Sequence, residues 1–352
     1  MTDWLHEPIA PIDEAARAGA RARQAMLTKP PGSLGRLEGL AEAFAGWQGQ
    51  SVPVLADIDI VVFAADHGVA ARGVSAFDQA VTGQMIANFA AGGAAICVLA
   101  RRHDARLSIV DLGAVAPPAD CASVIDARIA AGTADFTQSC AMQAGELEQA
   151  LQAGRERVSP SAHLFIGGEM GIGNTTSAAA ILAGLSGATP AQVVGRGTGI
   201  DAAGLARKQA VVEAGLARHR ASWQGATGSA RALSMLRCVG GFEIAALTGA
   251  FVAAAQAGVP VLVDGFIASV AALCAREIAP DCANWQLFGH RCAEAGHCYL
   301  LDMLEARPLL DLDMRLGEGS GAALALGVIG DALALHAGMA TFDEAGVTNR
   351  DG

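Results

Sequence analysis

The chain alternates short, almost continuous apolar runs with longer Ala-rich stretches of helical character. The apolar runs have the length of strands, and they cover residues 58–68, 107–114, 162–171, 259–266 and 284–290. Helical stretches lie between them, for example at 80–102 and 241–258. Apolar strands separated by helices are typical of a parallel sheet that is covered on both faces. The pattern therefore predicts an α/β protein built around a parallel sheet.

Helical patterns also fill both ends of the chain, outside this α/β core. With 352 residues the chain is longer than a typical single domain of about 150 residues. We expect residues 50–310 to form a large α/β substrate-binding domain. Residues 1–49 and 311–352 would pack together as a small, mainly helical domain that completes the active site.

Several of the predicted strands end in an acidic residue. The strand-terminal acids are Asp66, Asp111, Glu169 and Asp264, and the fifth strand ends at His290. Ligands of open α/β sheets bind outside the carboxyl ends of the strands. Acids at these positions can also cap the helices that follow, which is the simpler explanation for any single one. As a set they favour a site for a polar small molecule.

Composition narrows the class of ligand and the setting of the protein. The net charge is -11 and only 5% of residues are aromatic, with one tyrosine, which disfavours nucleic acid as a partner. Charged residues or glycines interrupt the longest apolar stretches, and the N-terminus lacks the pattern of a secretory signal, so no membrane association is expected. The eight cysteines include no CxxC pair, which fits reduced thiols in a cytoplasmic protein.

The segment GGEMGIGNTTSAAAILAGL at 167–185 carries the strongest local signal. A strand leads into a glycine-rich loop that opens a helix at Asn174–Thr176, where backbone N–H groups and the helix dipole can hold an anion. The loop has neither the GK[ST] ending of an NTPase loop nor a complete GxGxxG dinucleotide motif. A tight strand–helix connection, with Asn174 or Thr175 as the N-cap, would explain the same residues.

Two further glycine-rich segments contain isolated charges. GRGTGID at 195–201 is followed within two helical turns by Lys208, which could reach a phosphate or could be an ordinary solvated lysine. RLGEGSGAALAL at 315–326 places a single carboxylate, Glu318, between glycines in front of a helix-like run. KPPGSLGRLEGLAEAF at 29–44 reads as a rigid turn, an N-cap near Ser33 and an amphipathic helix.

A cluster of potential metal ligands lies in FGHRCAEAGHCYLL at 288–301. Its members are His290, Cys292, His297 and Cys298, whose spacing matches no standard zinc pattern. A metal-dependent hydrolase that uses His290, Cys292 and His297 remains an alternative.

The motifs together resemble one family. KPPGSLGRLE, AADHGV, GEMGIGNTTSAAA, GRGTGID, GGFEIAALTGA, VDGFI and RLGEGSGAALAL occur in the order found in the nicotinate-nucleotide–dimethylbenzimidazole phosphoribosyltransferase family of cobalamin lower-ligand synthesis. The resemblance spans residues 29–330. It implies a Rossmann-like fold and a cytoplasmic homodimer that needs no metal or cofactor. The implied reaction is transfer of ribose 5-phosphate from nicotinate mononucleotide to 5,6-dimethylbenzimidazole, which yields α-ribazole 5′-phosphate and nicotinate.

The resemblance also implies roles for individual residues. Glu318 matches the general base, and Glu169 matches a second acidic residue near the ribose and the incoming base. The residues expected to bind substrate are Gly171, Gly173, Asn174 and Thr175 at the helix start, Lys208 and Asp264 near the mononucleotide, and Ser75 and Gln84 near the benzimidazole. A non-catalytic protein that binds nucleotides through the same loop is the other alternative.

Overall fold

The computed structural model describes residues 2–118 and 121–348, which surround one parallel sheet. The sheet has six strands in the order β3-β2-β1-β4-β5-β6. They are β1 (Ile58–Ala65), β2 (Arg106–Gly113), β3 (Val124–Asp126), β4 (Leu164–Met170), β5 (Val261–Val263) and β6 (Gln286–Phe288). The predicted Rossmann-like α/β class and all five predicted strands are confirmed, and the edge strand β3 is additional. The strand order changes direction between β1 and β4, where an open α/β sheet opens a crevice for ligands.

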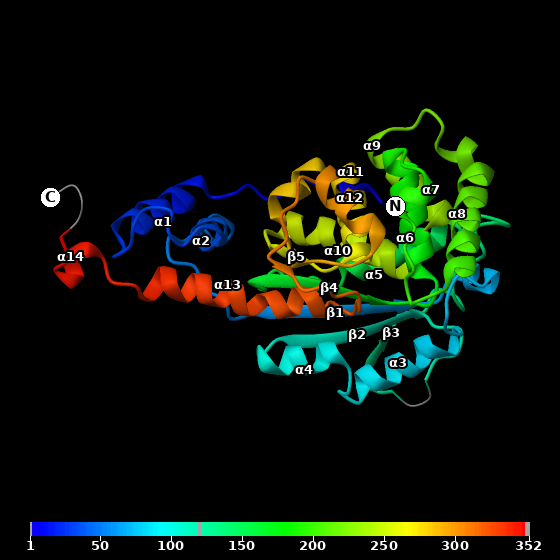
Figure 1. The fold of residues 1–352 in the computed structure, drawn as a ribbon, viewed down its shortest axis with the longest axis horizontal. Coiled ribbons are helices and arrows are strands. Elements are labelled where there is room, and N and C mark those ends of the chain that lie inside the picture. Colours follow the sequence, from blue (N-terminus) through cyan, green and yellow to red (C-terminus); the bar gives the residue numbers. More distant parts are fainter. Residues whose placement is uncertain (1, 119–120, 349–352) are drawn as a thin grey trace.

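Helices cover both faces of the sheet, as the runs of buried strand residues require (Figure 1). One face packs against α5 (Ala144–Arg155), α6 (Asn174–Ser186), α10 (Phe242–Ala257) and α11 (Phe266–Ile278). The other face packs against α3 (Ala80–Ala90), α4 (Ala95–Arg102) and the first half of α13 (Ser320–Gly338). Alternate residues of β1 belong to the two cores: Val61 and Phe63 face α10, while Ile60 and Val62 face α3 and α4.

The single helix predicted over 80–102 is wrong in one respect, because the chain breaks it into α3 and α4. The break falls at Ala91–Ala94, where Gly92 adopts a φ of +76° that ends the first helix. Ile96 therefore lies in the first turn of α4. Its backbone N–H donates to Glu318 Oε2 at 3.3 Å.

Two stretches are long and apolar enough to cross a membrane by length and composition alone. They are 80–102 and Ser320–Gly338. Helices that pack in the core of soluble proteins pass the same test, so the finding is weak evidence for a membrane span. Here the first stretch is divided into two helices, and α13 packs against β4, α4 and α2 (Arg36–Gln48).

Four further helices pack mainly against α6 and α11 rather than against the sheet itself. The helices are α7 (Pro190–Val193), α8 (Ala202–Trp223), α9 (Gly228–Val239) and α12 (Ala295–Met303). Short 3₁₀ turns lie at Asp3–His6, Gly68–Arg72 and Pro280–Trp285, and β7 (His290–Arg291) pairs with β8 (Leu310–Asp311).

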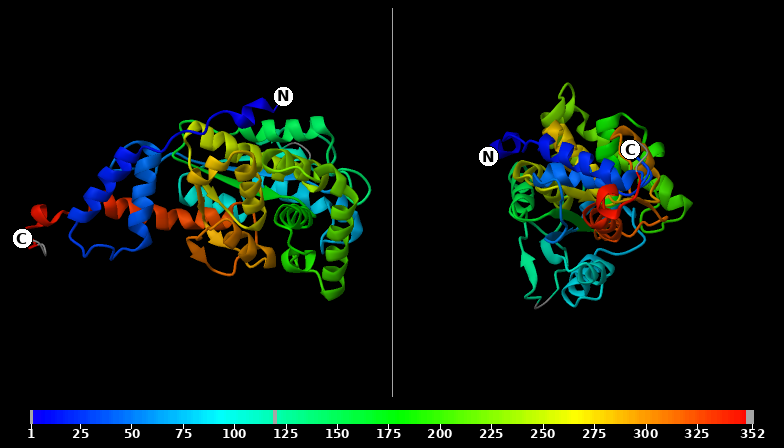
Figure 2. Two further views of the ribbon diagram at one scale, coloured as in Figure 1. Left: turned by 90° about the horizontal axis from the view of Figure 1, so that it is seen from above. Right: turned by 90° about the vertical axis from the view of Figure 1, so that its left-hand side faces the viewer.

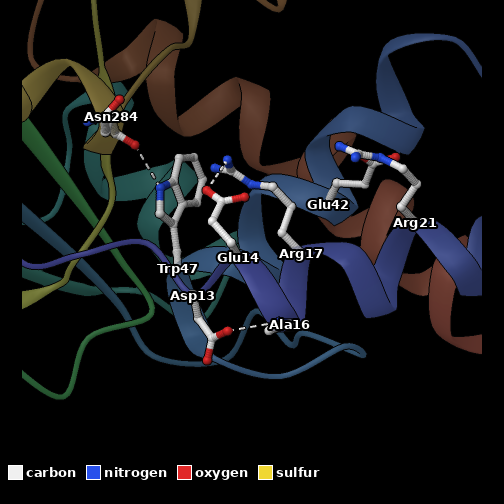
Figure 3. Close-up of polar contacts among 8 residues, drawn as sticks. All are labelled: Asp13, Glu14, Ala16, Arg17, Arg21, Glu42, Trp47 and Asn284. Atoms are coloured by element: carbon white, nitrogen blue, oxygen red, sulfur yellow. Dashed lines mark hydrogen bonds and ion pairs between the residues drawn. The ribbon is translucent and has the colours of Figure 1, made fainter.

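A group of helices extends from one end of the sheet. It consists of α1 (Glu14–Met26), α2, the second half of α13 and α14 (Phe342–Ala345), and it lies on the left of Figure 1 and of the first view in Figure 2. Arg21 of α1 pairs with Glu42 of α2 at 2.9 Å, and the Trp47 indole N–H donates to the Asn284 carbonyl at 2.9 Å, which joins α2 to the main body (Figure 3). The division into domains at 1–49, 50–310 and 311–352 stays a proposal.

The N-terminus of α2 differs slightly from the expected one. The helix begins at Arg36 after Gly35, which adopts a φ of +55°, rather than after a cap at Ser33. The buried Lys29 in the preceding turn pairs with Glu38 of α2 at 2.9 Å. The KPPGSLGRLE segment therefore anchors the start of this helix.

Candidate active site

A cavity of about 280 Å³ opens at the carboxyl ends of β4 and β5. The glycine-rich segments found in the sequence converge on it, although they are far apart along the chain. Its wall contains residues from 169–175, 197–198, 264–268 and 315–317, together with Phe77, His290, Cys292 and Glu294. The cavity lies at the carboxyl end of the sheet, as expected for an open α/β fold, but one strand beyond the change of direction between β1 and β4.

The strand-terminal acids divide into two groups. Glu169, Asp264 and His290 line the cavity and are less than 9% exposed. Asp66 instead accepts hydrogen bonds from the Thr82 hydroxyl (2.6 Å) and the Val115 N–H (2.8 Å). Asp111 accepts from the N–H groups of Gly113 and Ala114 at 2.9 and 2.8 Å. Two of the four acids, Glu169 and Asp264, therefore line the cavity, while Asp66 and Asp111 hold turns. A role for the two cavity acids in binding substrate stays a prediction.

Glu318 lies in a loop whose backbone is unusual. Gly317, Glu318 and Gly319 have φ angles of +91°, +66° and +86°, a region that glycine enters freely and glutamate rarely. The loop lies directly on β4: the Glu318 N–H donates to the Glu169 carbonyl at 3.2 Å. A Cβ on Gly168 would lie 2.2 Å from the Glu318 carbonyl oxygen, so residue 168 must be glycine for the loop to sit there. A strained backbone at a buried carboxylate is a common feature of functional sites.

Burial raises the pKa of two carboxyl groups at this end of the sheet, Glu169 and Glu318. Burial raises the pKa of Glu169 well above its ordinary value, and the charges of Glu243, Asp264 and Glu318 raise it further. Burial also raises the pKa of Glu318, whose Oε2 accepts a hydrogen bond from the Ile96 N–H at 3.3 Å that acts in the opposite direction. Glu318 is only 4% exposed. A carboxylate with a raised pKa is a better proton acceptor near neutral pH than an ordinary one.

The N-terminus of α6 forms another part of the cavity wall. Gly173 precedes the helix with a φ of +101°, and Gly171, Asn174 and Thr175 line the cavity. The Asn174 side-chain amide donates to Glu169 Oε2, which fixes that carboxyl group. The free N–H groups at the start of this helix can bind an anion.

Lys208 lies behind this wall. It is 1% exposed, and its Nζ donates to Thr175 Oγ1 at 2.7 Å. Burial lowers the pKa of Lys208 to about 8, although the charge of Glu294 acts in the other direction. Lys208 therefore places a positive charge next to the start of α6, without itself forming the cavity surface.

Sequence reasoning assigned no role to three residues of the cavity wall. Arg315 donates to the Gly197 carbonyl at 3.3 Å and adds a second cation beside the GRGTG loop. Phe77, 54% exposed, adds a flat apolar side chain to the wall, and Thr198 Oγ1 accepts a hydrogen bond from the neighbouring Ala76 N–H at 3.0 Å. Arg315 occurs in the same motif as Glu318, and this was the only sign in the sequence that Arg315 belongs to the site.

The two residues expected near a benzimidazole occupy different environments. Ser75 Oγ lies 3.2 Å from Thr198 Oγ1 and so borders the cavity wall. Gln84 is exposed on α3 and does not belong to the residues that line the cavity. Both assignments stay predictions.

Both histidines of the 288–301 segment are buried, and His290 Nε2 lies 3.4 Å from Asp264 Oδ1 at the cavity wall. His297 accepts a hydrogen bond at Nδ1 from the Cys292 N–H (2.8 Å), and its Nε2 lies 3.0 Å from Ser269 Oγ. Burial lowers the pKa of His297 to about 4, so the ring is neutral. Within residues 2–118 and 121–348, these side chains do not form a convergent set of metal ligands. The hydrolase alternative is wrong at this position, because both His297 nitrogens already have partners.

Comparisons with known proteins point to one family. The sequence model of a family described as "Phosphoribosyltransferase" matches residues 9–347. The chain is 53% identical over 351 residues to the nicotinate-nucleotide–dimethylbenzimidazole phosphoribosyltransferase of Xanthomonas oryzae pv. oryzae, covering 99% of each. It is also 53% identical over 344 residues to the enzyme of that name from Chromobacterium violaceum, covering 97% of this chain and 98% of that one.

A solved structure gives the same result. The crystal structure of nicotinate-nucleotide–dimethylbenzimidazole phosphoribosyltransferase from Thermus thermophilus superposes with a TM-score of 0.88 at 42% identity, over 96% of this chain and 100% of that chain. The match of the family model extends beyond both ends of the stretch, 29–330, in which the motifs occur. The chain therefore belongs to the nicotinate-nucleotide–dimethylbenzimidazole phosphoribosyltransferase family and is an enzyme of the phosphoribosyltransferase type.

Proposed function

We propose that this enzyme transfers ribose 5-phosphate from nicotinate mononucleotide to 5,6-dimethylbenzimidazole, producing α-ribazole 5′-phosphate and nicotinate. The family and the names of its relatives support the pair of substrates. The observation that carries the chemistry is the buried Glu318 carboxyl group, whose loop rests on β4 beside Glu169. Glu169 and Gly317 line the cavity, and Glu318 lies directly behind them without lining it.

The reaction explains why carboxylates gather in this cavity. Nicotinate leaves as its positively charged ring nitrogen becomes neutral, so it needs no general acid. The ribose carbon C1′ develops positive charge as that bond breaks, and nearby carboxylates and carbonyl dipoles stabilise it. Glu169 and Asp264 supply carboxyl groups from the ends of neighbouring strands. The chemistry requires neither a metal nor another cofactor.

Glu318 acts as the general base. One ring nitrogen of the benzimidazole bonds to C1′ while the bond from C1′ to nicotinate breaks, and the N–H of the other ring nitrogen gives its proton to Glu318. The product has the α configuration, so attack comes from the face opposite the leaving nicotinate and the anomeric carbon is inverted. Burial of Glu318 raises its pKa, which suits it to this task near neutral pH.

The phosphate and ribose bind at the part of the cavity wall that the start of α6 forms. The backbone of Gly171 and Gly173, with Asn174 and Thr175, would hold the mononucleotide at the start of α6. Lys208 acts through Thr175, to which it donates, and makes this end of the helix more positive. Arg315 would contact the phosphate or the nicotinate carboxylate directly.

The apolar base binds nearer the mouth. Phe77, Met170, Ile172 and Leu316 provide the apolar part of the wall, which suits a flat aromatic ring. Ser75, linked to Thr198, and the exposed Gln84 would position the benzimidazole.

We further propose that the enzyme is a cytoplasmic homodimer. Its small helical domain, residues 1–49 and 311–352, would supply Arg315 and Glu318 to a site formed mainly by residues 50–310. The support for this division is that residues 315–317, in the loop before α13, line the cavity. The rest of α13 runs out to α2 (Figure 1).

The test is to incubate the purified enzyme with nicotinate mononucleotide and a panel of flat bases, including 5,6-dimethylbenzimidazole and adenine. We expect nicotinate release that depends on the added base, and a product with the mass of the base plus ribose 5-phosphate whose anomeric configuration by NMR is α. Binding of nicotinate mononucleotide without nicotinate release under any base would instead support a non-catalytic binding protein. A β product would contradict inversion.

A further inference from the structure

Three side chains with strong metal-binding atoms converge away from the cavity. They are Cys140, in the loop between β3 and α5, His219 on α8, and Cys238 near the end of α9. Their ligand atoms all lie within 4.8 Å of one another. Cys140 Sγ lies 3.1 Å from Cys238 Sγ and 3.8 Å from His219 Nδ1. Within the described ranges, no other group of His, Cys, Asp and Glu converges in this way.

The histidine is oriented as a metal ligand would be. His219 Nε2 lies 2.7 Å from the Phe136 carbonyl and 3.1 Å from the Ser139 carbonyl. Since carbonyl oxygens only accept hydrogen bonds, Nε2 carries the proton, and Nδ1 presents its lone pair to the Cys140 sulfur. Metal-binding histidines in proteins typically donate their other N–H to a carbonyl or carboxylate, which fixes the tautomer and the ring.

The two cysteines are held by paired backbone segments. The Ala141 N–H donates to the Cys238 carbonyl at 3.0 Å, and the Met142 N–H donates to the Arg237 carbonyl at 2.9 Å. His219 is 6% exposed and Cys238 is fully buried, while Cys140 is partly exposed. The donor set is therefore rigid and still reachable from solvent on the Cys140 side.

From this geometry we propose that Cys140, His219 and Cys238 form a Zn²⁺ site. Zinc bonds of about 2.3 Å to sulfur and about 2.0 Å to nitrogen, at tetrahedral angles, place two sulfurs about 3.8 Å apart and sulfur and nitrogen about 3.5 Å apart. The sulfurs need to separate by less than about 1 Å to reach that arrangement. Two thiolates and an imidazole select a thiophilic ion over Mg²⁺ or Ca²⁺. A water on the exposed side of Cys140 completes the tetrahedron.

The site joins three parts of the fold. It ties the loop that contains Cys140 to both α8 and α9, and α8 also holds Lys208 three turns earlier. The proposed transfer reaction needs no metal, so the ion would stabilise the structure rather than take part in chemistry. Binding deprotonates the two thiols and releases their protons, so affinity rises with pH.

The experiment measures Zn²⁺ binding by the reduced, metal-stripped enzyme under anaerobic conditions, by competition with a chromogenic chelator. We expect one Zn²⁺ per chain for the wild type. Loss of the partner that orients a metal-binding histidine typically lowers metal affinity about 10–100-fold. C140S, C238S and H219Q remove a ligand itself, so each should lower Zn²⁺ affinity at least about 100-fold. C298S removes the exposed Cys298 outside the cluster and should bind like the wild type.

Co²⁺ provides a readout that does not depend on the variants folding. The Co²⁺-loaded wild type should show thiolate charge-transfer absorption and the intense visible bands of tetrahedral cobalt, and Zn²⁺ should bleach both. Their absence contradicts the proposal. So does Zn²⁺ binding that C140S and C238S leave unchanged, or a Cys140–Cys238 disulfide that mass spectrometry detects after treatment with reductant.

Discussion

The substitution Gly168→Ala tests whether the position of the Glu318 loop matters, without changing any charged group. Gly168 lies in the middle of β4, and its added Cβ would be 2.2 Å from the Glu318 carbonyl oxygen and 2.4 Å from the Glu318 carbonyl carbon. Ordinary van der Waals contact begins at 3.4 Å, and both neighbours are backbone atoms. The loop must therefore move away from β4 by about 1 Å, the scale of misplacement that can cost about 100-fold in rate.

That displacement predicts a specific set of kinetic changes. It lengthens the bond between the Glu318 N–H and the Glu169 carbonyl, which is 3.2 Å long, and it moves the carboxylate relative to the cavity. We expect kcat to fall about 100-fold. The KM for nicotinate mononucleotide should change less, because the atoms nearest the added Cβ belong to Glu318 and Gly319 and not to the start of α6.

The assay is steady-state nicotinate release with 5,6-dimethylbenzimidazole, together with thermal unfolding. Gly327→Ala is the matched control: Gly327 lies in α13, which follows the same loop, and a Cβ there has no neighbour within 4 Å. The control should keep wild-type kcat and unfold at the same temperature or slightly higher, since alanine favours helix. A Gly168→Ala enzyme with wild-type kcat would refute the argument that β4 positions the base.

Three further changes probe the charges around the cavity. Because burial lowers the pKa of Lys208 to about 8, kcat/KM for nicotinate mononucleotide should fall as pH rises through 8; Lys208→Met should lower kcat/KM at pH 7 by about 10–100-fold and abolish that fall. An unchanged alkaline limb in the variant would assign the titration to another group. Arg315→Ala should raise the KM for nicotinate mononucleotide about 10-fold at low salt and change kcat less, and an unchanged KM would remove Arg315 from the substrate contacts. Because the pKa of Glu169 is raised in the fold, the contribution of Glu169 to stability is complete below its unfolded-state pKa and is lost as pH rises. Glu169→Gln stays neutral, so it should stabilise the fold by roughly 0.5–2 kcal/mol at pH 8 and by little at pH 4. The same substitution should lower kcat. Destabilisation at pH 8, measured by denaturant unfolding, would contradict the raised pKa.

The sheet was largely predictable because its central strands β1, β4 and β5 are buried along almost their whole length. All eight residues of β1 are buried, so its sequence is a continuous apolar run that signals a central parallel strand. The edge strand β3 has three residues, Val124–Asp126, and none of them is fully buried, so its sequence carries no comparable signal.

The candidate site was predictable only as far as its residues occur in distinctive motifs. Position at the end of a strand marked Glu169 and Asp264, but it marked Asp66 and Asp111 equally well. Whether such an acid faces the cavity or a turn depends on which loop folds over it, and Asp66 meets the N–H of Val115, 49 residues away. Local sequence cannot determine that contact.

The backbone of the Glu318 loop was beyond the reach of sequence patterns. Glycines on both sides of Glu318 indicate that the backbone of the loop can adopt unusual conformations. They do not indicate that Glu318 itself has a φ of +66°. The requirement for glycine at 168 arises from the approach of the Glu318 backbone to β4, a contact between segments 150 residues apart. Packing of this kind is set by the assembled fold.

The most direct test of Glu318 as the general base is the single-turnover rate of Glu318→Gln with saturating nicotinate mononucleotide and 5,6-dimethylbenzimidazole. The amide keeps the size of the side chain and cannot accept the proton. We expect the variant to bind nicotinate mononucleotide with wild-type affinity and to release nicotinate about 10²–10⁴-fold more slowly. A rate within a few-fold of wild type, in a variant that binds both substrates, would contradict the assignment.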